Sequence, residues 1–213
     1  MRGRLAEYRL FLREYVRSFR TTGAIVPSGR WLARALARYV TPKGPAQHIL
    51  EVGPGTGPVT RCIAARMGPE DHLDLVELNG SFVERLRVAL RNDPALRRVA
   101  DRTRLFHRAV EDLPGQACYD LIISGLPLNN FLPAEVERIL ATMARLAKPG
   151  AILSFFEYMW IRSIRALVSG RAQRERLRRV GRALCAVLGP HEIRRDWIWL
   201  NLPPAWVHHV RFE

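Results

Sequence analysis

The sequence predicts an α/β fold in which a doubly wound, mostly parallel sheet carries helices on both faces. Short apolar runs typical of buried strands alternate with segments of helical periodicity, which is the pattern of parallel sheets. One of these runs, residues 48–52, is followed by a glycine-rich turn at 53–57 (GPGTG) and then by a helical pattern. Strand, tight turn and helix form the layout of a nucleotide-type cofactor site, although ordinary strand–helix turns also carry glycines.

Length and composition indicate one globular domain of 213 residues, with 48% hydrophobic and 25% charged residues. No run approaches the ~20 apolar residues of a membrane span, and no signal peptide is recognisable at the N-terminus. Cys62, Cys118 and Cys185 are widely spaced in apolar settings. We therefore expect a cytoplasmic protein with reduced, buried thiols, without a disulfide framework or a metal site.

The net charge of +14 is the unusual quantity. Of the 34 basic residues only two, Lys43 and Lys148, are lysines, and the excess is concentrated in two segments. Residues 1–30 hold seven Arg and two Glu, and residues 158–182 hold eight Arg and one Glu. Such concentrated charge indicates a polyanionic partner, either nucleic acid or an anionic membrane surface.

The N-terminal segment 4–20 has aromatic and aliphatic residues at helical spacing, with arginines on the other side. It is either an amphipathic helix docked on the core or an interfacial helix whose aromatic side lies among lipid headgroups. A second helix is expected from an N-cap at Ser28 through Trp31 to Tyr39. We divide the chain into residues 1–45, which hold these helices, and a domain at 46–213.

The second buried strand, 73–77, ends in Glu77, which lies 24 residues beyond Gly53. A carboxylate at about this distance accepts hydrogen bonds from ribose hydroxyls, although Glu77 could also simply precede a helix that begins near Ser81. A third strand is expected at 104–110, and the turn Glu111-Asp112 would then lie over an adenine.

The rest of the chain continues the alternation. We expect strands at 119–124 and 150–158, helices at 133–147 and 174–188, and a closing pair of strands at 192–200 and 205–212.

Four segments together resemble one family, the bacterial phospholipid N-methyltransferases that convert phosphatidylethanolamine towards phosphatidylcholine. They are Thr22–Ser28 (TGAIVPS) after the basic helix, Glu51–Gly57 (EVGPGTG), Ser124–Leu128 (SGLPL) and Asn201–Ala205 (NLPPA). The resemblance implies a class I, Rossmann-like methyltransferase fold with a terminal antiparallel strand. It also implies S-adenosylmethionine as methyl donor, S-adenosylhomocysteine as product, and attachment to anionic membranes through the N-terminal helix.

Two departures bear on the methyl acceptor. The related rRNA adenine dimethyltransferases have Asn-Leu-Pro-Tyr after the fourth strand, where the amide accepts from the target amine and the ring stacks on the flipped base. Here residues 125–128 read GLPL, without amide or ring, which favours a headgroup amine over a base. At 155–158 the chain reads FFEY, with an acidic residue that the family pattern lacks.

The predicted site residues fall into three groups. The cofactor residues are Glu51, Gly53, Gly55, Thr56, Gly57, Glu77, Leu78, Ala109, Val110, Glu111 and Ser124. The catalytic candidates are the Leu126 carbonyl and Tyr158, as acceptors for the amine, and Glu157, which with Tyr158 could hold the cationic product. The arginines expected to bind membrane or lipid phosphate are Arg9, Arg13, Arg17, Arg20, Arg162, Arg165 and Arg171.

The leading hypothesis is an aminolipid N-methyltransferase on the inner face of the cytoplasmic membrane, with phosphatidylethanolamine as acceptor and no stable nucleic-acid partner. Within that class an ornithine lipid is the alternative acceptor. Two other classes remain open: an rRNA adenine N6-methyltransferase or other nucleic-acid methyltransferase, which the charge permits, and a catalytically silent membrane-binding module, which the intact glycines and Glu77 disfavour.

Overall fold

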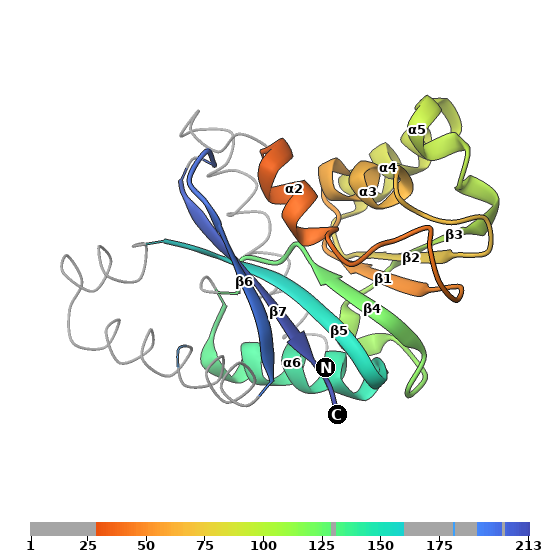
Figure 1. Ribbon diagram of the computed structural model, residues 1–213. Coiled ribbons are helices and arrows are strands. Elements are labelled where there is room, and N and C mark those ends of the chain that lie inside the picture. Colours follow the sequence, from red (N-terminus) through yellow and green to blue (C-terminus); the bar gives the residue numbers. More distant parts are fainter. Residues whose placement is uncertain (1–28, 129–130, 160–180, 182–190, 202) are drawn as a thin grey trace.

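The computed structural model describes residues 29–128, 131–159, 181, 191–201 and 203–213. These residues form a seven-stranded sheet in the order β3-β2-β1-β4-β5-β7-β6, with helices on both faces (Figure 1). The first five strands in chain order pair in parallel, whereas β7 runs antiparallel to both of its neighbours, β5 and β6. The predicted doubly wound fold with a terminal antiparallel strand is confirmed.

The strands are β1 (His48–Val52), β2 (His72–Glu77), β3 (Thr103–His107), β4 (Tyr119–Ser124), β5 (Ala147–Tyr158), β6 (Glu192–Ile198) and β7 (Ala205–Arg211). The described helices are α2 (Arg30–Leu36), α3 (Pro58–Ala64), α4 (Gly80–Asn92), α5 (Pro94–Arg97) and α6 (Pro133–Leu146), with short 3₁₀ turns η1 (Ala100–Arg102) and η2 (Val110–Asp112). Within the described ranges, none of these helices is long and apolar enough to cross a bilayer.

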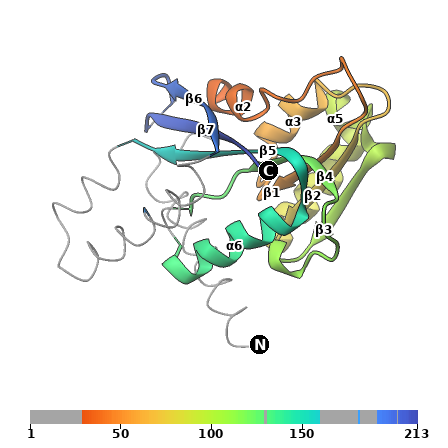
Figure 2. The same cartoon turned by 60° about the horizontal axis from the view of Figure 1, so that its bottom comes forward.

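Two hydrophobic clusters cover the two faces of the sheet. Because side chains alternate along a strand, Ile49 belongs to the cluster under α2 and α3, whereas Leu50 belongs to the cluster under α6. Figure 2 shows α6 on one side of the sheet and α2, α3 and α5 on the other. Buried parallel strands need apolar residues on both faces, which is why these strands are nearly continuous hydrophobic runs in the sequence.

The amino ends of four strands are held together by one buried carboxylate, Asp74 of β2. Its oxygens accept hydrogen bonds from Arg104 of β3 at 2.7 and 2.6 Å and from the Tyr119 hydroxyl of β4 at 2.8 Å. The His48 ring of β1 lies 3.4 Å away. Burial alone would raise the pKa of Asp74, but these donors outweigh burial and lower it to about 2. The opposite, carboxyl edge of the sheet is left for the glycine turn.

Helix α2 begins and ends differently from the prediction. Its N-cap is Gly29 rather than Ser28, and the regular helix ends at Leu36, before Tyr39. The Gly29 N–H donates to the side chain of Asn201, 172 residues away, at 3.0 Å, so this helix end is capped by the β6–β7 connection. Asn201 also donates from Nδ2 to the Pro203 carbonyl at 2.7 Å, which gives the NLPPA segment a structural role.

Several other predicted boundaries need correction. Strand β3 ends at His107 instead of 110, because the chain turns into η2. Strand β6 ends at Ile198 instead of 200. Helix α4 begins at Gly80, close to the expected start near Ser81, and its cap is Asn79, whose Oδ1 accepts from two backbone N–H groups.

The cysteine prediction holds in part. Cys62 and Cys118 are free thiols but only partly buried, whereas Cys185 lies outside the described residues. The predicted helices at 4–20 and 174–188 lie outside the described residues too, apart from residue 181. Nothing in the fold tests the division at residue 45, although Leu32 and Leu36 of α2 are buried in the same cluster as Ile49.

We predict that Asn201→Ala lowers the free energy of unfolding by about 1 kcal/mol, because the partly buried Gly29 N–H loses its acceptor. Urea unfolding followed by circular dichroism measures the change. Asn92→Ala, at the exposed C-terminal end of α4, is the matched control and should change the stability by less than ~0.5 kcal/mol. Equal effects in the two variants would contradict the capping role.

Candidate cofactor and active site

The glycine turn after β1 requires glycine at three alternate positions. Gly53, Gly55 and Gly57 have φ angles of +71°, +58° and +82°, in the left-handed region that side chains disfavour. Gly57 is the N-cap of α3, and Pro58 occupies the first helical position. The turn therefore delivers the chain directly from the carboxyl end of β1 into a helix N-terminus.

The middle glycine leaves room for a ligand. A Cβ atom built on Gly55 would meet no atom within 4 Å, whereas one on Gly53 would lie 2.6 Å from Cδ2 of Leu126. Gly53 is thus glycine because the protein packs against it, and the space over Gly55 is open. Open backbone in a glycine turn is what a nucleotide-type cofactor needs for close approach.

Glu77 lies beside this turn, at the end of β2. Its Oε2 accepts from the Gly55 N–H at 3.0 Å and its Oε1 from the Asn79 N–H at 2.8 Å. Burial raises the pKa of Glu77, although these backbone donors act in the opposite direction. Each carboxylate oxygen has a further lone pair that can accept from a ribose hydroxyl. The geometry accordingly fits the predicted ribose role, and Leu78 follows as a partly buried neighbour.

Glu51, on β1, is the unusual group of the site. The side chain is fully buried, and neither carboxylate oxygen has a hydrogen-bond partner. Burial, together with the nearby Glu77 carboxylate, raises the pKa of Glu51 to about 8, and Thr60 partly opposes the rise. A buried acid without partners is costly in the free protein and fits a site that receives a cationic ligand group. Thr56 is exposed in the turn.

The turn after β3 supplies the third side of the site. Ala109 is the N-cap of η2 and Val110 is buried beneath it. Glu111 Oε2 is buried without a hydrogen-bond partner, and burial raises the pKa of this carboxyl as well. An unpaired carboxylic acid of this kind can bond the edge of an adenine, as predicted for this turn.

The exit turn of β4 closes against the glycine turn. Ser124 is fully buried, and its Oγ accepts from the Leu126 N–H at 3.3 Å. The Gly125 N–H donates to the Val52 carbonyl at 2.8 Å, and a Cβ on Gly125 would lie 2.6 Å from the Gly53 carbonyl oxygen. No side chain, and hence no amide, can stand at residue 125 while the two turns touch in this way.

The catalytic candidates differ in how well they fit their predicted roles. The Leu126 carbonyl accepts from the Leu128 N–H at 3.0 Å and keeps one lone pair for a substrate amine. Burial raises the pKa of Tyr158 to about 12, so its hydroxyl stays protonated at neutral pH. Tyr158 can accept a hydrogen bond from an amine but is a poor acceptor of its proton.

Glu157 is a buried residue, with 3% of its area exposed. Its Oε2 lies 3.6 Å from Nε2 of His208, and Nδ1 of His208 lies 2.7 Å from Glu192 on β6. His208 and Glu192 were not predicted, because only the pairing of β5 with β7 and of β7 with β6 brings them to Glu157. The signal in the sequence was the pair His208 and His209 within the mostly apolar run 205–210.

The remaining predictions concern charge and metals. The predicted arginines 9, 13, 17, 20, 162, 165 and 171 all lie outside the described residues, so their roles stay predictions. Within the described part of the chain, no group of three His, Cys, Asp or Glu side chains is arranged to hold a metal ion.

Comparison with known proteins shows which fold this chain shares. Residues 49–150 match the family model described as a methyltransferase domain. The fold is similar to Burkholderia thailandensis 1,6-didemethyltoxoflavin-N1-methyltransferase with bound S-adenosylhomocysteine, with a TM-score of 0.65 at 16% identity over 97% of this chain and 89% of that one. The chain therefore has the Rossmann-like fold of the class I methyltransferases, and the family match agrees with the cofactor site described above.

Two further proteins are similar to this chain. A protein of Singulisphaera acidiphila named ornithine lipid N-methyltransferase is 29% identical over 164 residues, which are 74% of this chain and 81% of that protein. P. horikoshii TYW2, solved with MeSAdo, has a TM-score of 0.59 at 17% identity over 88% of this chain. This chain spans 64% of the TYW2 chain, less than two thirds of its length.

We predict that Glu77→Ala weakens the binding of S-adenosylhomocysteine at least tenfold. The substitution removes a hydrogen-bonded carboxylate, worth about 1.5–3 kcal/mol, and frees the Gly55 N–H that it holds. Isothermal titration calorimetry measures the affinity. Glu84→Ala, on α4 with a side chain that is 67% exposed, is the control. An affinity that is unchanged in Glu77→Ala would remove Glu77 from the site.

A second prediction concerns pH. In the unfolded chain Glu51 titrates near its ordinary pKa of 4.5, whereas in the free folded protein it titrates near 8. Between these values the folded state holds one more proton, so the Glu51 contribution to stability is present below pH ~4.5 and is lost as the pH rises towards 8. Relative to Glu51→Gln, the free energy of unfolding of the wild type should fall by on the order of a few kcal/mol across this pH range. If the free energy of unfolding changed equally with pH in the wild type and in Glu51→Gln, the result would contradict this prediction.

Proposed function

We propose that the protein transfers a methyl group from S-adenosylmethionine to the amino group of a membrane aminolipid. The observation that carries the proposal is the similarity to the ornithine lipid N-methyltransferase, which extends over 81% of that protein. This relative favours an ornithine lipid as acceptor over phosphatidylethanolamine, which the sequence resemblance alone had placed first. Phosphatidylethanolamine stays the second candidate.

The acceptor side of the site supports an amine without an aromatic face. Leu128 occupies the position of the stacking ring of adenine dimethyltransferases, and its side chain is 1% exposed in the core under α6. Gly125 has no room for the amide that would hold a base amine. Methylation of RNA is therefore the less favoured alternative, in spite of the net charge of +14.

In the proposed reaction, different residues bind the donor and orient the acceptor amine. The backbone over Gly55, the Glu77 carboxylate and the η2 turn would hold the donor, which supplies an electrophilic methyl group when bound. The acceptor amine must be neutral to attack, and desolvation in an apolar site lowers its pKa. The Leu126 carbonyl and the Tyr158 hydroxyl can orient that amine, and positioning of this kind accounts for much of the rate of a displacement reaction. The enzyme would act at the inner face of the cytoplasmic membrane.

We predict that the purified protein transfers radiolabelled methyl from S-adenosylmethionine to ornithine lipid. The lipid, phosphatidylethanolamine and total rRNA are offered separately in detergent, and the products are resolved by thin-layer chromatography or gel. Gly55→Asp, which fills the open space over a left-handed residue, should abolish transfer, whereas Val88→Asp, at an exposed position of α4, should retain it. Label in phosphatidylethanolamine alone would select the second acceptor, and label in RNA alone would refute the proposal.

A further inference from the structure

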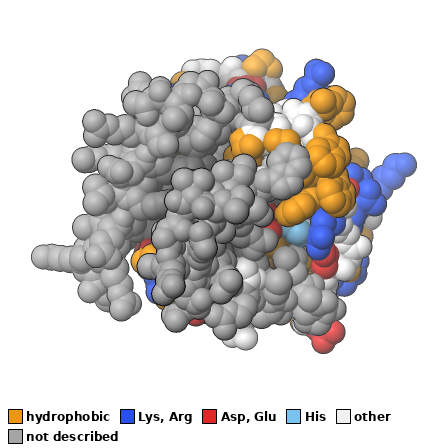
Figure 3. All heavy atoms as spheres, turned by 90° about the vertical axis from the view of Figure 1, so that its left-hand side faces the viewer, with side chains coloured by type: hydrophobic (Ala, Val, Ile, Leu, Met, Phe, Trp, Pro, Cys, Tyr) orange, Lys and Arg blue, Asp and Glu red, His pale blue; other side chains and the backbone are white. Residues whose placement is uncertain are grey.

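A row of three polar side chains crosses the antiparallel part of the sheet, from Glu157 of β5 through His208 of β7 to Glu192 of β6. Glu157 and His208 are 3% and 2% exposed, whereas the side chain of Glu192, on the outermost strand, is 20% exposed. Figure 3 views the molecule from the left of Figure 1 and shows acidic and basic side chains at the described surface of that face. The row connects a buried carboxylate with a partly exposed one.

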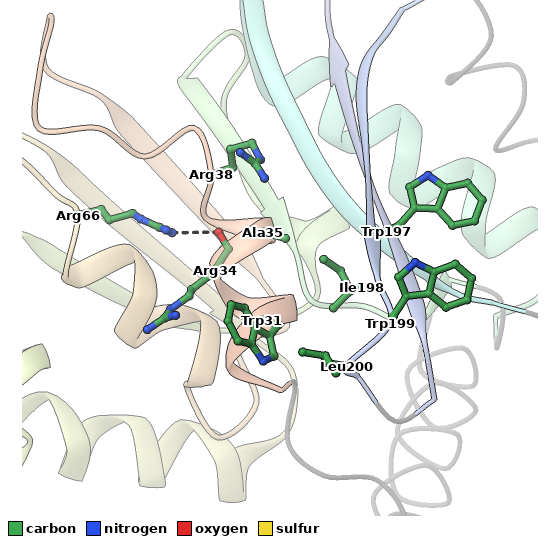
Figure 4. Close-up of a pocket in the computed structure, with 9 residues that line it drawn as sticks. All are labelled: Trp31, Arg34, Ala35, Arg38, Arg66, Trp197, Ile198, Trp199 and Leu200. Carbon is green, nitrogen blue, oxygen red and sulfur yellow. Dashed lines mark hydrogen bonds between the residues drawn. The ribbon is translucent and has the colours of Figure 1, made fainter.

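Glu157 and His208 lie on the face of the sheet that is turned away from α2. The His208 ring stacks on Phe155 with 5.2 Å between ring centroids, and Phe155 belongs to the hydrophobic cluster under α6. Because side chains alternate along a strand, Glu157 points to the same face as Phe155. Figure 4 shows this alternation on β6, where Ile198 points towards α2 and Trp197 points away from it. The row is therefore on the side of the sheet that α6 covers.

The strand register places Glu157 at the edge of the sheet that carries the exit turn of β4. Phe155 pairs with Ser124, the last residue of β4, and Glu157 lies two residues further towards the carboxyl end of β5. Leu126, whose carbonyl is available to an acceptor amine, belongs to the same cluster as Phe155. Since neighbouring strands are about 4.8 Å apart, we expect an amine at the Leu126 carbonyl to lie close to the Glu157 carboxylate.

The contacts of His208 fix the position of its hydrogen atom. Burial would raise the pKa of Glu192, but donors from Arg195 and His208 lower it, so that Glu192 is a carboxylate and can only accept. Nδ1 of His208, 2.7 Å from Glu192, therefore carries hydrogen. Nε2 faces Glu157 at 3.6 Å and, among the described residues, has no hydrogen-bond partner. In the neutral ring Nε2 thus has the lone pair that can take a proton.

The reaction proposed above needs such a proton acceptor. An acceptor ammonium has to lose one proton before its nitrogen can attack the methyl group. The Leu126 carbonyl can orient the amine but is not basic enough to take its proton. The Tyr158 hydroxyl, with a pKa of about 12, stays protonated at neutral pH and takes no further proton. Glu157 and His208 are a carboxylate and an imidazole at the same edge of the sheet, and both groups bind protons.

We propose that Glu157 and His208 take the proton of the acceptor ammonium, with Glu192 as the positioning residue that fixes the His208 ring. The inference rests on the proposed function, because it concerns the amine of that reaction. The ammonium transfers one proton to Glu157, and Nε2 of His208 takes this proton, which leaves an imidazolium between two carboxylates. The distance of 3.6 Å has to shorten for this step, as catalytic hydrogen bonds often do when substrate binds.

The methyl transfer that follows is balanced. The neutral nitrogen attacks the methyl carbon of the donor, an N–C bond forms, and the C–S bond breaks with its electron pair moving to sulfur. The products are a methylated ammonium and S-adenosylhomocysteine. The proton held by His208 passes to water after they leave, which returns the ring to its neutral state.

The experiment measures the pH–rate profile of His208→Gln from about pH 7 to about pH 9.5, with detergent-dispersed lipid as acceptor. Glutamine can still donate to Glu192 but takes no proton. The kcat should fall about a hundredfold at pH ~7, with an unchanged KM for lipid and unchanged S-adenosylhomocysteine binding. The deficit should shrink as the pH rises, because more of the acceptor amine is then neutral in solution. In the described part of the chain, the charged groups around the ring are Glu157, Glu192 and Arg195.

Two further variants complete the experiment. His209→Gln is the matched control, because this neighbouring ring points to the opposite face, where it contacts Ser154 and Asp196. It should keep the pH profile of the wild type. Glu192→Gln keeps an acceptor for Nδ1 but removes the charge that stabilises the imidazolium, so kcat should fall about tenfold at pH ~7 and recover at higher pH. This variant carries the test if His208→Gln does not fold, which circular dichroism reveals.

A loss of kcat by the same factor at every pH would overturn the proposal, because that is the effect of a purely structural defect. Nitrogen NMR of histidine-labelled protein, assigned against His208→Gln, tests the ring without turnover. A neutral His208 with hydrogen on Nε2 alone would also overturn the proposal. Equal rates of lipid methylation by the wild type and His208→Gln would overturn it and leave the proposed function in place. Methylation of rRNA alone would refute both, since the exocyclic amine of adenine is neutral before attack.

Discussion

The site depends on one close contact between two backbone turns. The exit turn of β4 lies against the glycine turn of β1, joined by the hydrogen bond from Gly125 to Val52, with no space for a side chain between Gly125 and the Gly53 carbonyl. On the far side, Leu126 fills the space that a Cβ on Gly53 would need. The glycine turn and the exit turn of β4 are therefore held together, so that in the proposed function the position of the acceptor amine would be tied to that of the donor.

Much of the fold and of the cofactor site could be predicted from the sequence, because buried parallel strands and glycine turns have local sequence signals. The apolar run 48–52, the three alternate glycines and Glu77 at the end of the second run are readable from residue type and spacing. Features that depend on contacts between segments far apart in the sequence cannot be predicted in this way. The cap of α2 by Asn201 joins the two ends of the described chain, and the contact of His208 with Glu157 needs the antiparallel register of β5 and β7.

The surface illustrates the same limit. The sequence predicts a strand through Leu200, in which tryptophans at 197 and 199 would share one face of a sheet edge. The strand instead ends at Ile198, and the turn that follows brings Leu200 against Trp31 of α2. Only the fold therefore brings Leu200 close to Trp31, which is distant in the sequence.

The long-range packing of α2 has a consequence for the order of folding. This helix is synthesised before every strand of the sheet, yet its apolar side contacts β5, β6 and β7, the last strands to be made. Contacts between segments so distant in sequence form late, because the chain between them must first be closed. During synthesis Leu32 and Leu36 can pack early against α3 and the first strands, but part of their apolar surface stays without its final partners until β7 emerges, and a chaperone would have to shield that part until then.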